Sequence, residues 1–195
     1  MKKLGMVIVN YNDSDTTIEL LKRIKNFKSL NHIVVVDNAS TDDSYDKLRE
    51  YEKKNITIIK NSKNNGYAYG LNTGAKYLIR TLGKCNIIFS NSDIIIKDDA
   101  DLKTLSSRIS GDIAVVGPTI EEKGNLNRGW KCSSVWDEVL YNLPLISRLF
   151  RLKSYYPKTY YSFDISYVDV VSGCFFVVDS EVLKMVHYFD EVTFL

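Results

Sequence analysis

The feature of this sequence that most constrains its fold is a set of three apolar runs that each end in asparagine, serine or aspartate residues. The runs are 7–9, 33–36 and 87–89, and the polar clusters are 10–12, 37–40 and 90–93. Runs of β-branched residues that are apolar on both faces are typical of parallel strands buried between helices. Ligands of such sheets bind beyond the carboxyl ends of the strands. The sequence therefore predicts one polar site shared by three strand ends.

Length and composition limit the class of protein. At 195 residues, the chain is long enough for one domain with a full core and too short for two ordinary domains. A formal charge of +2 is too small to indicate a nucleic-acid partner. Three cysteines without CxxC spacing favour a reducing compartment such as the cytoplasm. No stretch approaches the ~20 apolar residues of a membrane span.

Strand and helix patterns alternate along the first part of the chain. The clearest helix has apolar residues at steps of four, three and four, at Leu71, Ala75, Leu78 and Leu82. This alternation predicts an α/β fold with a Rossmann-like, mostly parallel sheet and helices on both faces. Right-handed crossovers then place the strand ends on one side. Further strands are expected at 56–59, 94–96 and 113–116, and a helix start near 13–16 with capping-box spacing.

The acids that follow the second and third runs are candidate ligands. Asp37 stands at a strand tip, where an acid often accepts a hydrogen bond from the base or ribose of a nucleotide. A plain turn, with Ser40 as a helix cap, is the alternative. Asp93, beside Asn91 and Ser92, can supply a carboxylate to a divalent cation that also binds a diphosphate. A type I turn is the alternative there.

Two glycine-containing motifs are further candidates. Residues 64–66 precede a helix and can present backbone amides to a phosphate or a sugar. They lack the spacing of a dinucleotide fingerprint or a P-loop, which disfavours nicotinamide dehydrogenases and P-loop nucleotidases. Gly173 interrupts a strand pattern, which often marks a bulge or the close approach of a ligand. Cys174 has no histidine near it in sequence, so core packing is a better interpretation than a nucleophile.

In this order, the motifs resemble those of family 2 glycosyltransferases of the GT-A fold, particularly the rhamnosyltransferase-like branch. The match covers nearly the whole chain, and 36–42 followed by 64–68 is its most specific part. The resemblance implies inverting transfer of a sugar from a UDP, dTDP or GDP donor to a saccharide or lipid-linked acceptor, in cell-surface polysaccharide synthesis. The motifs are 7–12, 36–42, 64–68 with Asn72 and Gly74, 91–93, 172–174 and 189–191.

The resemblance also assigns roles by matching position. Asp93 would bind Mg²⁺ or Mn²⁺ at the diphosphate, although Asn91 replaces the first acid of the family's metal motif. The catalytic base is expected as an acid beyond Leu195, so this chain should bind donor and transfer poorly. Nucleoside contacts are assigned to Asn10, Tyr11, Asn12, Asp37, Asn38 and Ser40, the ribose–diphosphate side to Asn64 and Gly66, and the donor-sugar side to Asn91, Asp93, Gly173 and Cys174.

The predicted organisation is a single domain, 1–195, with a nucleotide-binding half at 1–120 and an incomplete acceptor-side half at 121–195. The basic, aromatic stretch 148–161 is a candidate for peripheral contact with a membrane surface at its cytoplasmic face. A solvated loop is the alternative. Two other functions remain open. A nucleotidyltransferase should carry a glycine-rich, basic loop where 10–13 stands, and a non-catalytic module would bind nucleotide sugars without turnover.

Overall fold

The structure is a computed structural model that describes residues 2–132, 156–162 and 164–192. The chain forms two compact units. One comprises Met1–Val116 together with Gly173–Leu195, and the other is Gly117–Ser172. The boundary expected at residue 120 lies close to the first of these limits, but the last 23 residues, Gly173–Leu195, group with the first unit. The single-domain organisation stays a prediction, and each unit is described by itself.

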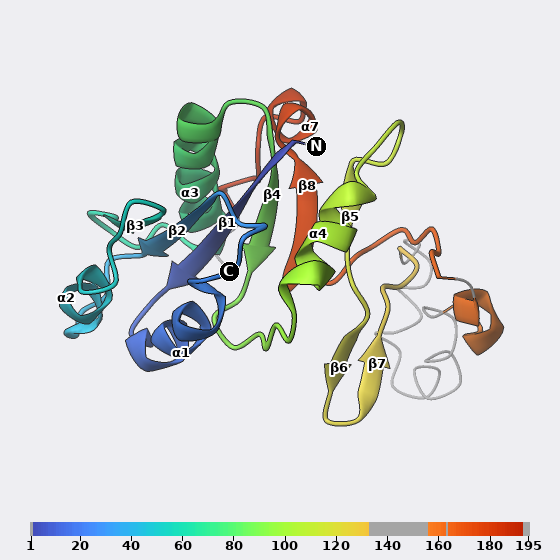
Figure 1. Cartoon of the computed structure of the whole chain (residues 1–195), viewed down its shortest axis with the longest axis horizontal. Coiled ribbons are helices and arrows are strands. Elements are labelled where there is room, and N and C mark those ends of the chain that lie inside the picture. Colours follow the sequence, from blue (N-terminus) through green and yellow to red (C-terminus); the bar gives the residue numbers. More distant parts are fainter. Residues whose placement is uncertain (1, 133–155, 163, 193–195) are drawn as a thin grey trace. The chain divides into compact units, whose positions relative to one another are not determined.

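The first unit is built on a six-stranded sheet with the strand order β3-β2-β1-β4-β8-β5 (Figure 1). The first four strands along the chain are parallel to one another, as the buried apolar runs predict. Strand β8 pairs antiparallel with β4, and β5 pairs antiparallel with β8. The strands are β1 (Lys3–Asn10), β2 (His32–Asp37), β3 (Ile56–Lys60), β4 (Cys85–Ser90), β5 (Val115–Val116) and β8 (Phe175–Asp179).

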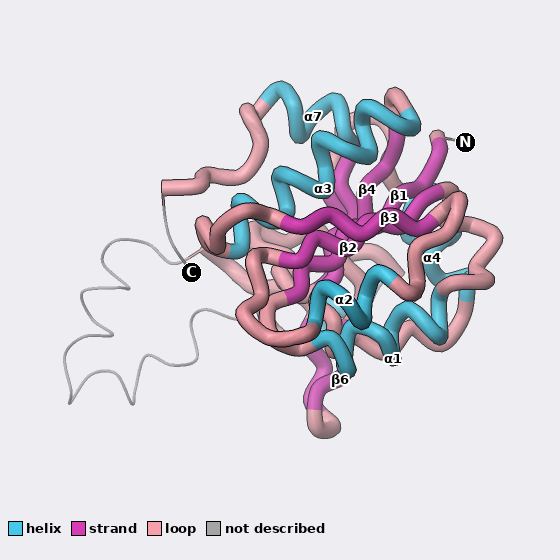
Figure 2. Tube along the Cα trace, turned by 90° about the vertical axis from the view of Figure 1, so that its left-hand side faces the viewer, coloured by secondary structure: helices cyan, strands magenta, loops and turns pink. Residues whose placement is uncertain are grey.

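Helices cover both faces of this sheet, which confirms the predicted α/β architecture. Figure 2 shows α3 and α7 on one side of the strands and α1 and α2 on the other. Apolar side chains from both layers fill the core, and residues of β1, β2 and β4 are almost entirely buried. The helices are α1 (Ser14–Ile24), α2 (Ser44–Arg49), α3 (Tyr67–Leu82), α4 (Asp99–Ser107) and α7 (Ser180–Met185).

Helix α3 packs unusually close to β1 because glycines face the strand. A Cβ atom built on Gly74 would lie 2.4 Å from Val7 Cγ1, and one on Gly70 would lie 2.9 Å from Val9 Cγ1. Real Cβ atoms do not approach other carbons so closely, so each glycine is required by packing rather than by its backbone angles. This close contact fixes the start of α3 beside the end of β1.

Three sequence-based expectations need correction. Residues 94–96 form no strand, and the strand expected at 113–116 is reduced to Val115–Val116. The reason is that β8, from far along the chain, occupies the edge of β4 that a local strand would need. At the start of α1, the cap is Asp13, whose carboxylate accepts the Thr16 amide, instead of a capping box begun by Thr16.

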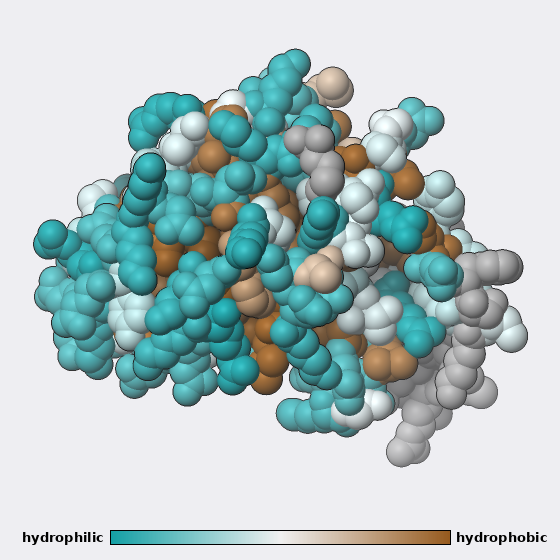
Figure 3. Space-filling view, in the orientation of Figure 1, coloured by the Kyte–Doolittle hydropathy of each residue, from teal (hydrophilic) through white to brown (hydrophobic). Residues whose placement is uncertain are grey.

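The second unit contains a short antiparallel hairpin of β6 (Ile120–Glu122) and β7 (Asn125–Asn127), and a 3₁₀ helix, Lys158–Ser162. Of the stretch 148–161, residues 148–155 lie outside the described residues, and membrane contact stays a prediction. None of the helices in the described part is both long and apolar enough to cross a bilayer. Hydrophilic residues cover most of the face seen in Figure 3.

Candidate functional site

A buried hydrogen-bond network joins the carboxyl ends of β1 and β2. The Asp37 carboxylate accepts bonds from Asn10 Nδ2 at 3.0 Å, Ser40 Oγ at 2.5 Å and the Ser40 amide at 3.1 Å. Thr17 Oγ1 donates to Asn10 Oδ1 at 2.9 Å. Asp37 is 0% exposed and Asn10 only 1% exposed. These two side chains therefore hold the strand ends together and shape the loop that follows Asp37.

The loops above this network adopt left-handed backbone conformations. Asn12 has φ of 52° and Ala39 has φ of 61°, which is uncommon for residues other than glycine. The loops are pinned to each other, because the Thr41 amide donates to Asn12 Oδ1 at 2.8 Å and the Asn12 amide to Ser40 Oγ at 2.9 Å. Strained backbone of this kind gathers at functional sites. Tyr11, between β1 and α1, is 49% exposed.

Asn38 connects the end of β2 to the start of α3. Its Nδ2 donates to Asn64 Oδ1 at 2.9 Å and to the Gly66 carbonyl at 3.0 Å, while its Oδ1 accepts from Asn61 Nδ2 at 2.9 Å. Asn64 Oδ1 also accepts the Gly66 amide at 2.9 Å. The amide group of Asn38 is thus used within the chain, and it fixes the turn that begins α3.

Tyr67, the first residue of α3, extends the polar rim to β4 and β8. Its hydroxyl donates to Asn91 Oδ1 at 2.9 Å, and the Asn91 amide donates to the Cys174 carbonyl at 2.8 Å. Burial, with smaller contributions from Cys174 and the charge of Asp93, raises the pKa of Tyr67 to about 12. The phenol therefore stays neutral at neutral pH and donates a hydrogen bond to Asn91, in the loop that carries Asp93.

The donor atoms around Asp93 fit a hard divalent cation. Asp93 lies exposed in the turn after β4, beside Asn91. Among the described residues, no group of three or more His, Cys, Asp or Glu side chains could hold a metal ion unaided. Mg²⁺ typically takes one or two carboxylates and completes its shell with phosphate oxygens and water. Asp93 therefore suits a cation that arrives with a phosphorylated ligand.

Gly173 precedes β8 in open surroundings. A Cβ atom added there would meet no heavy atom of the described chain within 4 Å, and its φ is outside the left-handed region. Neither backbone strain nor internal packing accounts for a glycine at this position. Room beside the backbone is what a close-approaching ligand would need.

The structure brings the predicted residues to one edge of the sheet. Consecutive contacts run from Asn10 to Asp37, across Asn38 to the start of α3, and from Tyr67 to Asn91 and Cys174. Their binding roles stay predictions. Sequence patterns assigned no role to three supporting residues, although one of them lies in the 64–68 motif, because each acts through a partner distant in sequence. These are Thr17, Asn61 and Tyr67.

Hydrogen bonds from Asn72 of α3 hold the segment 188–191. Asn72 Nδ2 donates to the Phe189 carbonyl at 2.9 Å and to Glu191 Oε1 at 2.7 Å, and Asn72 Oδ1 accepts the Phe189 amide at 3.1 Å. The Phe189 ring packs edge-on against Phe89, with centroids 5.0 Å apart. The segment after α7 is therefore anchored between α3 and the sheet.

Comparisons with known proteins identify the fold. A family model described as glycosyl transferase family 2 matches residues 6–184. Among solved structures, the mannosyltransferase PcManGT of Pyrobaculum calidifontis, in complex with GDP-Man and Mn²⁺, is 16% identical with a TM-score of 0.66. It is matched over 98% of this chain and 48% of its own. GalNAc-T7, with UDP, GalNAc and Mn²⁺, is 18% identical with a TM-score of 0.64, over 98% of this chain and 38% of its own.

Residues 1–349 of S. aureus TarS are 20% identical with a TM-score of 0.62, over 100% of this chain and 52% of that one. None of the curated protein sequences matches significantly. At these identities the structural likeness establishes the fold alone, and that fold is the GT-A fold expected from the sequence. The chain spans about half the length of PcManGT and of the TarS fragment.

Proposed function

The chain belongs to glycosyl transferase family 2, and on this basis we propose that it is the donor-binding part of an inverting glycosyltransferase. The observation that carries the proposal is the continuous polar rim at the carboxyl edge of the sheet, which links the ends of β1 and β2, the start of α3 and the turn after β4. In α/β sheets of this kind, ligands bind beyond that edge.

The nucleoside is assigned to the β1–β2 end of this rim. Tyr11 is half exposed and offers an aromatic face, and Asn12 is exposed beside it. Asp37 and Asn10 are buried beneath them and give the loops their shape. The proposed nucleoside set is Asn10, Tyr11, Asn12, Asp37, Asn38 and Ser40.

The diphosphate is assigned to the region between the start of α3 and Asp93. The amino end of a 16-residue helix favours an anion, since its first amides are unpaired and its dipole is positive there. Asn64 and Gly66 would line the ribose–diphosphate side. Asp93 would hold Mg²⁺ or Mn²⁺, and that ion supplies Lewis-acid stabilisation of the departing nucleoside diphosphate. Asn91, Gly173 and Cys174 would face the donor sugar.

The remaining parts of the proposal concern the whole protein. Transfer with inversion requires a base that takes the proton of the acceptor hydroxyl, and we place that base outside residues 1–195. The acceptor is proposed to be a saccharide or a lipid-linked saccharide of cell-surface polysaccharide, and the sugar a hexose or rhamnose. We propose a cytoplasmic location, with peripheral membrane contact through 148–161.

Donor binding can be tested by thermal unfolding with UDP, dTDP or GDP and Mn²⁺. A ligand at 100 times its Kd should add ~2.7 kcal/mol to the free energy of unfolding. Asp93→Asn should remove the Mn²⁺-dependent part of this shift and leave the unliganded protein as stable as before, because Asp93 is exposed. Asp101→Asn, an exposed acid on α4, is the matched control. The proposal is wrong if no nucleotide diphosphate shifts the transition, with or without metal.

The donor-sugar assignment makes a separate prediction for Gly173→Ala. The added methyl group meets no described atom within 4 Å, so the unfolding free energy should stay within about 0.5 kcal/mol of the parent protein. Affinity for a nucleotide sugar should fall, whereas affinity for the nucleoside diphosphate without sugar should not. Isothermal titration of both ligands measures the difference. Equal affinities for the nucleotide sugar before and after the change would contradict the assignment.

A further inference from the structure

A cavity of about 620 Å³ lies at the amino end of β1, at the opposite edge of the sheet from the proposed donor site. Its walls come from the start of β1, the loop between α1 and β2, and α4 with its cap. Lys3 and Asn10 mark the two ends of β1, which at ~3.3 Å per residue are about 23 Å apart. A ligand in this cavity would therefore not be the donor. Four of the wall residues are lysines: Lys2, Lys3, Lys28 and Lys103.

The two acids in the wall are used by the protein's own backbone. Asp98 caps α4 and accepts the Ala100 amide at 2.9 Å. Asp99 accepts the amide of Lys28 at 2.9 Å and that of Ser29 at 3.1 Å, and it also accepts the Ser29 hydroxyl. The Asp99 carboxylate therefore holds the loop to the helix. It is poorly placed to bind a cation, because both of its oxygens already accept donors, and Asp98 Oδ1 is used by the helix cap.

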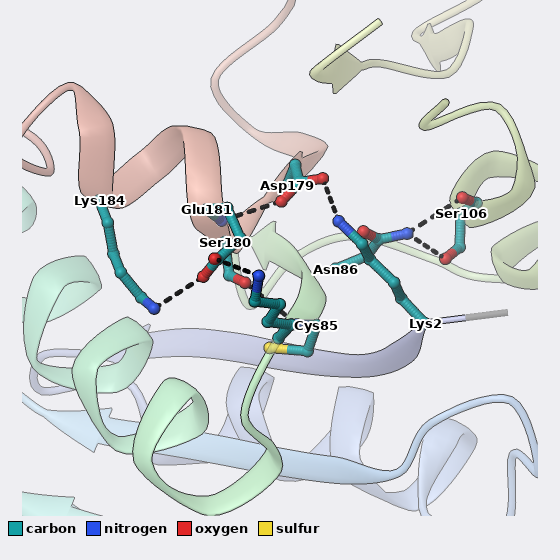
Figure 4. A network of polar contacts seen from close by, with 9 residues as sticks. Lys2, Cys85, Asn86, Ser106, Asp179, Ser180, Glu181 and Lys184 are labelled. Carbon is teal, nitrogen blue, oxygen red and sulfur yellow. Dashed lines mark hydrogen bonds and ion pairs between the residues drawn. The ribbon is translucent and has the colours of Figure 1, made fainter. Parts of the chain in front are cut away.

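Two other wall residues are anchored from outside the cavity. Lys2 forms an ion pair with Asp179, and Ser106 accepts from Asn86 Nδ2 through its hydroxyl at 2.9 Å and its carbonyl at 3.1 Å (Figure 4). The wall is thus largely preorganised. Within the part of the chain that the structure describes, Lys3, Lys28 and Lys103 have no carboxylate oxygen within 4.0 Å of their ammonium groups.

We propose that this cavity binds a phosphorylated ligand through Lys3, Lys28 and Lys103. Its volume lies within the ~300–1,000 Å³ of small-molecule sites. Lysine ammonium groups are strong donors to phosphate oxygens. The wall has four lysines against Asp98 and Asp99, and even with Lys2 paired to Asp179 it keeps an excess of positive charge that a phosphoryl group neutralises. The ligand's phosphate is free in solution or part of a lipid headgroup, and the recognising chemistry is the same.

The test uses inorganic pyrophosphate as the probe, in EDTA so that a metal-dependent donor site contributes nothing. Isothermal titration should show one saturable site in the parent protein. The double variant Lys28→Glu/Lys103→Glu should weaken it at least about tenfold, since two attractive charges become repulsive. Lys54→Glu, at an exposed lysine after α2, is the control for general charge effects. Asp93→Asn should keep full pyrophosphate affinity.

A vesicle arm separates the two sources of phosphate. A lipid headgroup is identified if the protein sediments with phosphatidylglycerol vesicles but not with phosphatidylcholine vesicles, and if the double variant loses this sedimentation. Binding of pyrophosphate without binding of vesicles identifies a soluble ligand. If the charge reversal impairs folding, Lys28→Gln/Lys103→Gln replaces it. The proposal is overturned if neither probe binds, or if Lys54→Glu weakens binding as much as the double variant. The Mn²⁺-dependent nucleotide shift should persist in the double variant, so this result is independent of the proposed function.

Discussion

The two edges of the same sheet are built on different physical principles. At the carboxyl edge, buried neutral amides and hydroxyls surround one buried carboxylate, Asp37, and leave Tyr11 and Asp93 exposed. At the amino edge, charged groups lie at the surface, where Lys2 pairs with Asp179, and Glu181 pairs with two lysines. One edge is shaped by hydrogen bonds and the other by exposed charge.

This difference separates structural rigidity from ligand attraction. A buried hydrogen bond to a charged group contributes more to stability than an exposed ion pair, which typically contributes ~0–1 kcal/mol. The carboxyl edge can therefore hold strained loops such as Ala39 in place for a shaped ligand. The amino edge gains little stability from its ion pairs. Among the described residues, Lys3, Lys28 and Lys103 form no ion pair there and can respond to an anion.

The largest difference is expected between matched aspartate substitutions at the two edges. Asp37→Ala removes the acceptor of three hydrogen bonds at a position that is 0% exposed, and should cost about 3 kcal/mol of unfolding free energy. Asp179→Ala removes a helix cap and an exposed ion pair, and should cost about 1 kcal/mol. Urea unfolding measures both. Equal losses would show that the two edges do not differ in this way.

An intermediate effect is expected for Tyr67→Phe, which removes the hydrogen bond to Asn91 and should cost about 1 kcal/mol at neutral pH. Burial raises the pKa of Tyr67 from 10.0 to about 12, so its contribution is complete below pH 10 and is lost as pH rises through about 12. The stability difference between parent and variant should therefore shrink over that range. Tyr69→Phe, the same change in the first turn of α3, is the matched control variant.

The smallest effect is expected at the amino edge, at His32. Its ring packs near Tyr77 and its Nε2 lies 2.9 Å from Thr57 Oγ1, and burial lowers its pKa below the usual 6.5. Below pH 6.5 the unfolded chain takes up the proton first, so stability should fall as pH drops toward the lower folded pKa. His32→Gln should lack this decline. The prediction is wrong if the unfolding free energy of His32→Gln depends on pH between 7.5 and 5.5 as that of the parent protein does. His187→Gln, at an exposed histidine, is the control.

Local patterns predicted the central strands and the polar strand ends well, because both depend on short-range chemistry. The runs that became β1, β2 and β4 are apolar on both faces, and burial on both sides of a sheet is what such runs require. The same local argument failed at 94–96. That run is equally apolar, but the edge of β4 is taken by β8, whose pairing spans about half the chain.

The sequence predicted which positions form the site but not the contacts among them. The expected contact of Asp37 with the nucleoside stays a prediction, and the structure adds that its oxygens accept bonds from Asn10 and Ser40. Nothing in the sequence near Asn61 or Thr17 indicates their partners, because those partners lie on other strands and loops.

The amino acid sequence by itself determined that polar residues would end several buried parallel strands, and therefore that they would meet at one edge. Only the tertiary structure decided which of them are buried supports and which remain open to a ligand, because burial depends on every neighbouring element. It also decided that lysines far apart in the chain would line one cavity. No local sequence pattern indicates that these lysines are neighbours. The packing of β1, α4 and the loop before β2 brings them together, despite the repulsion between their charges.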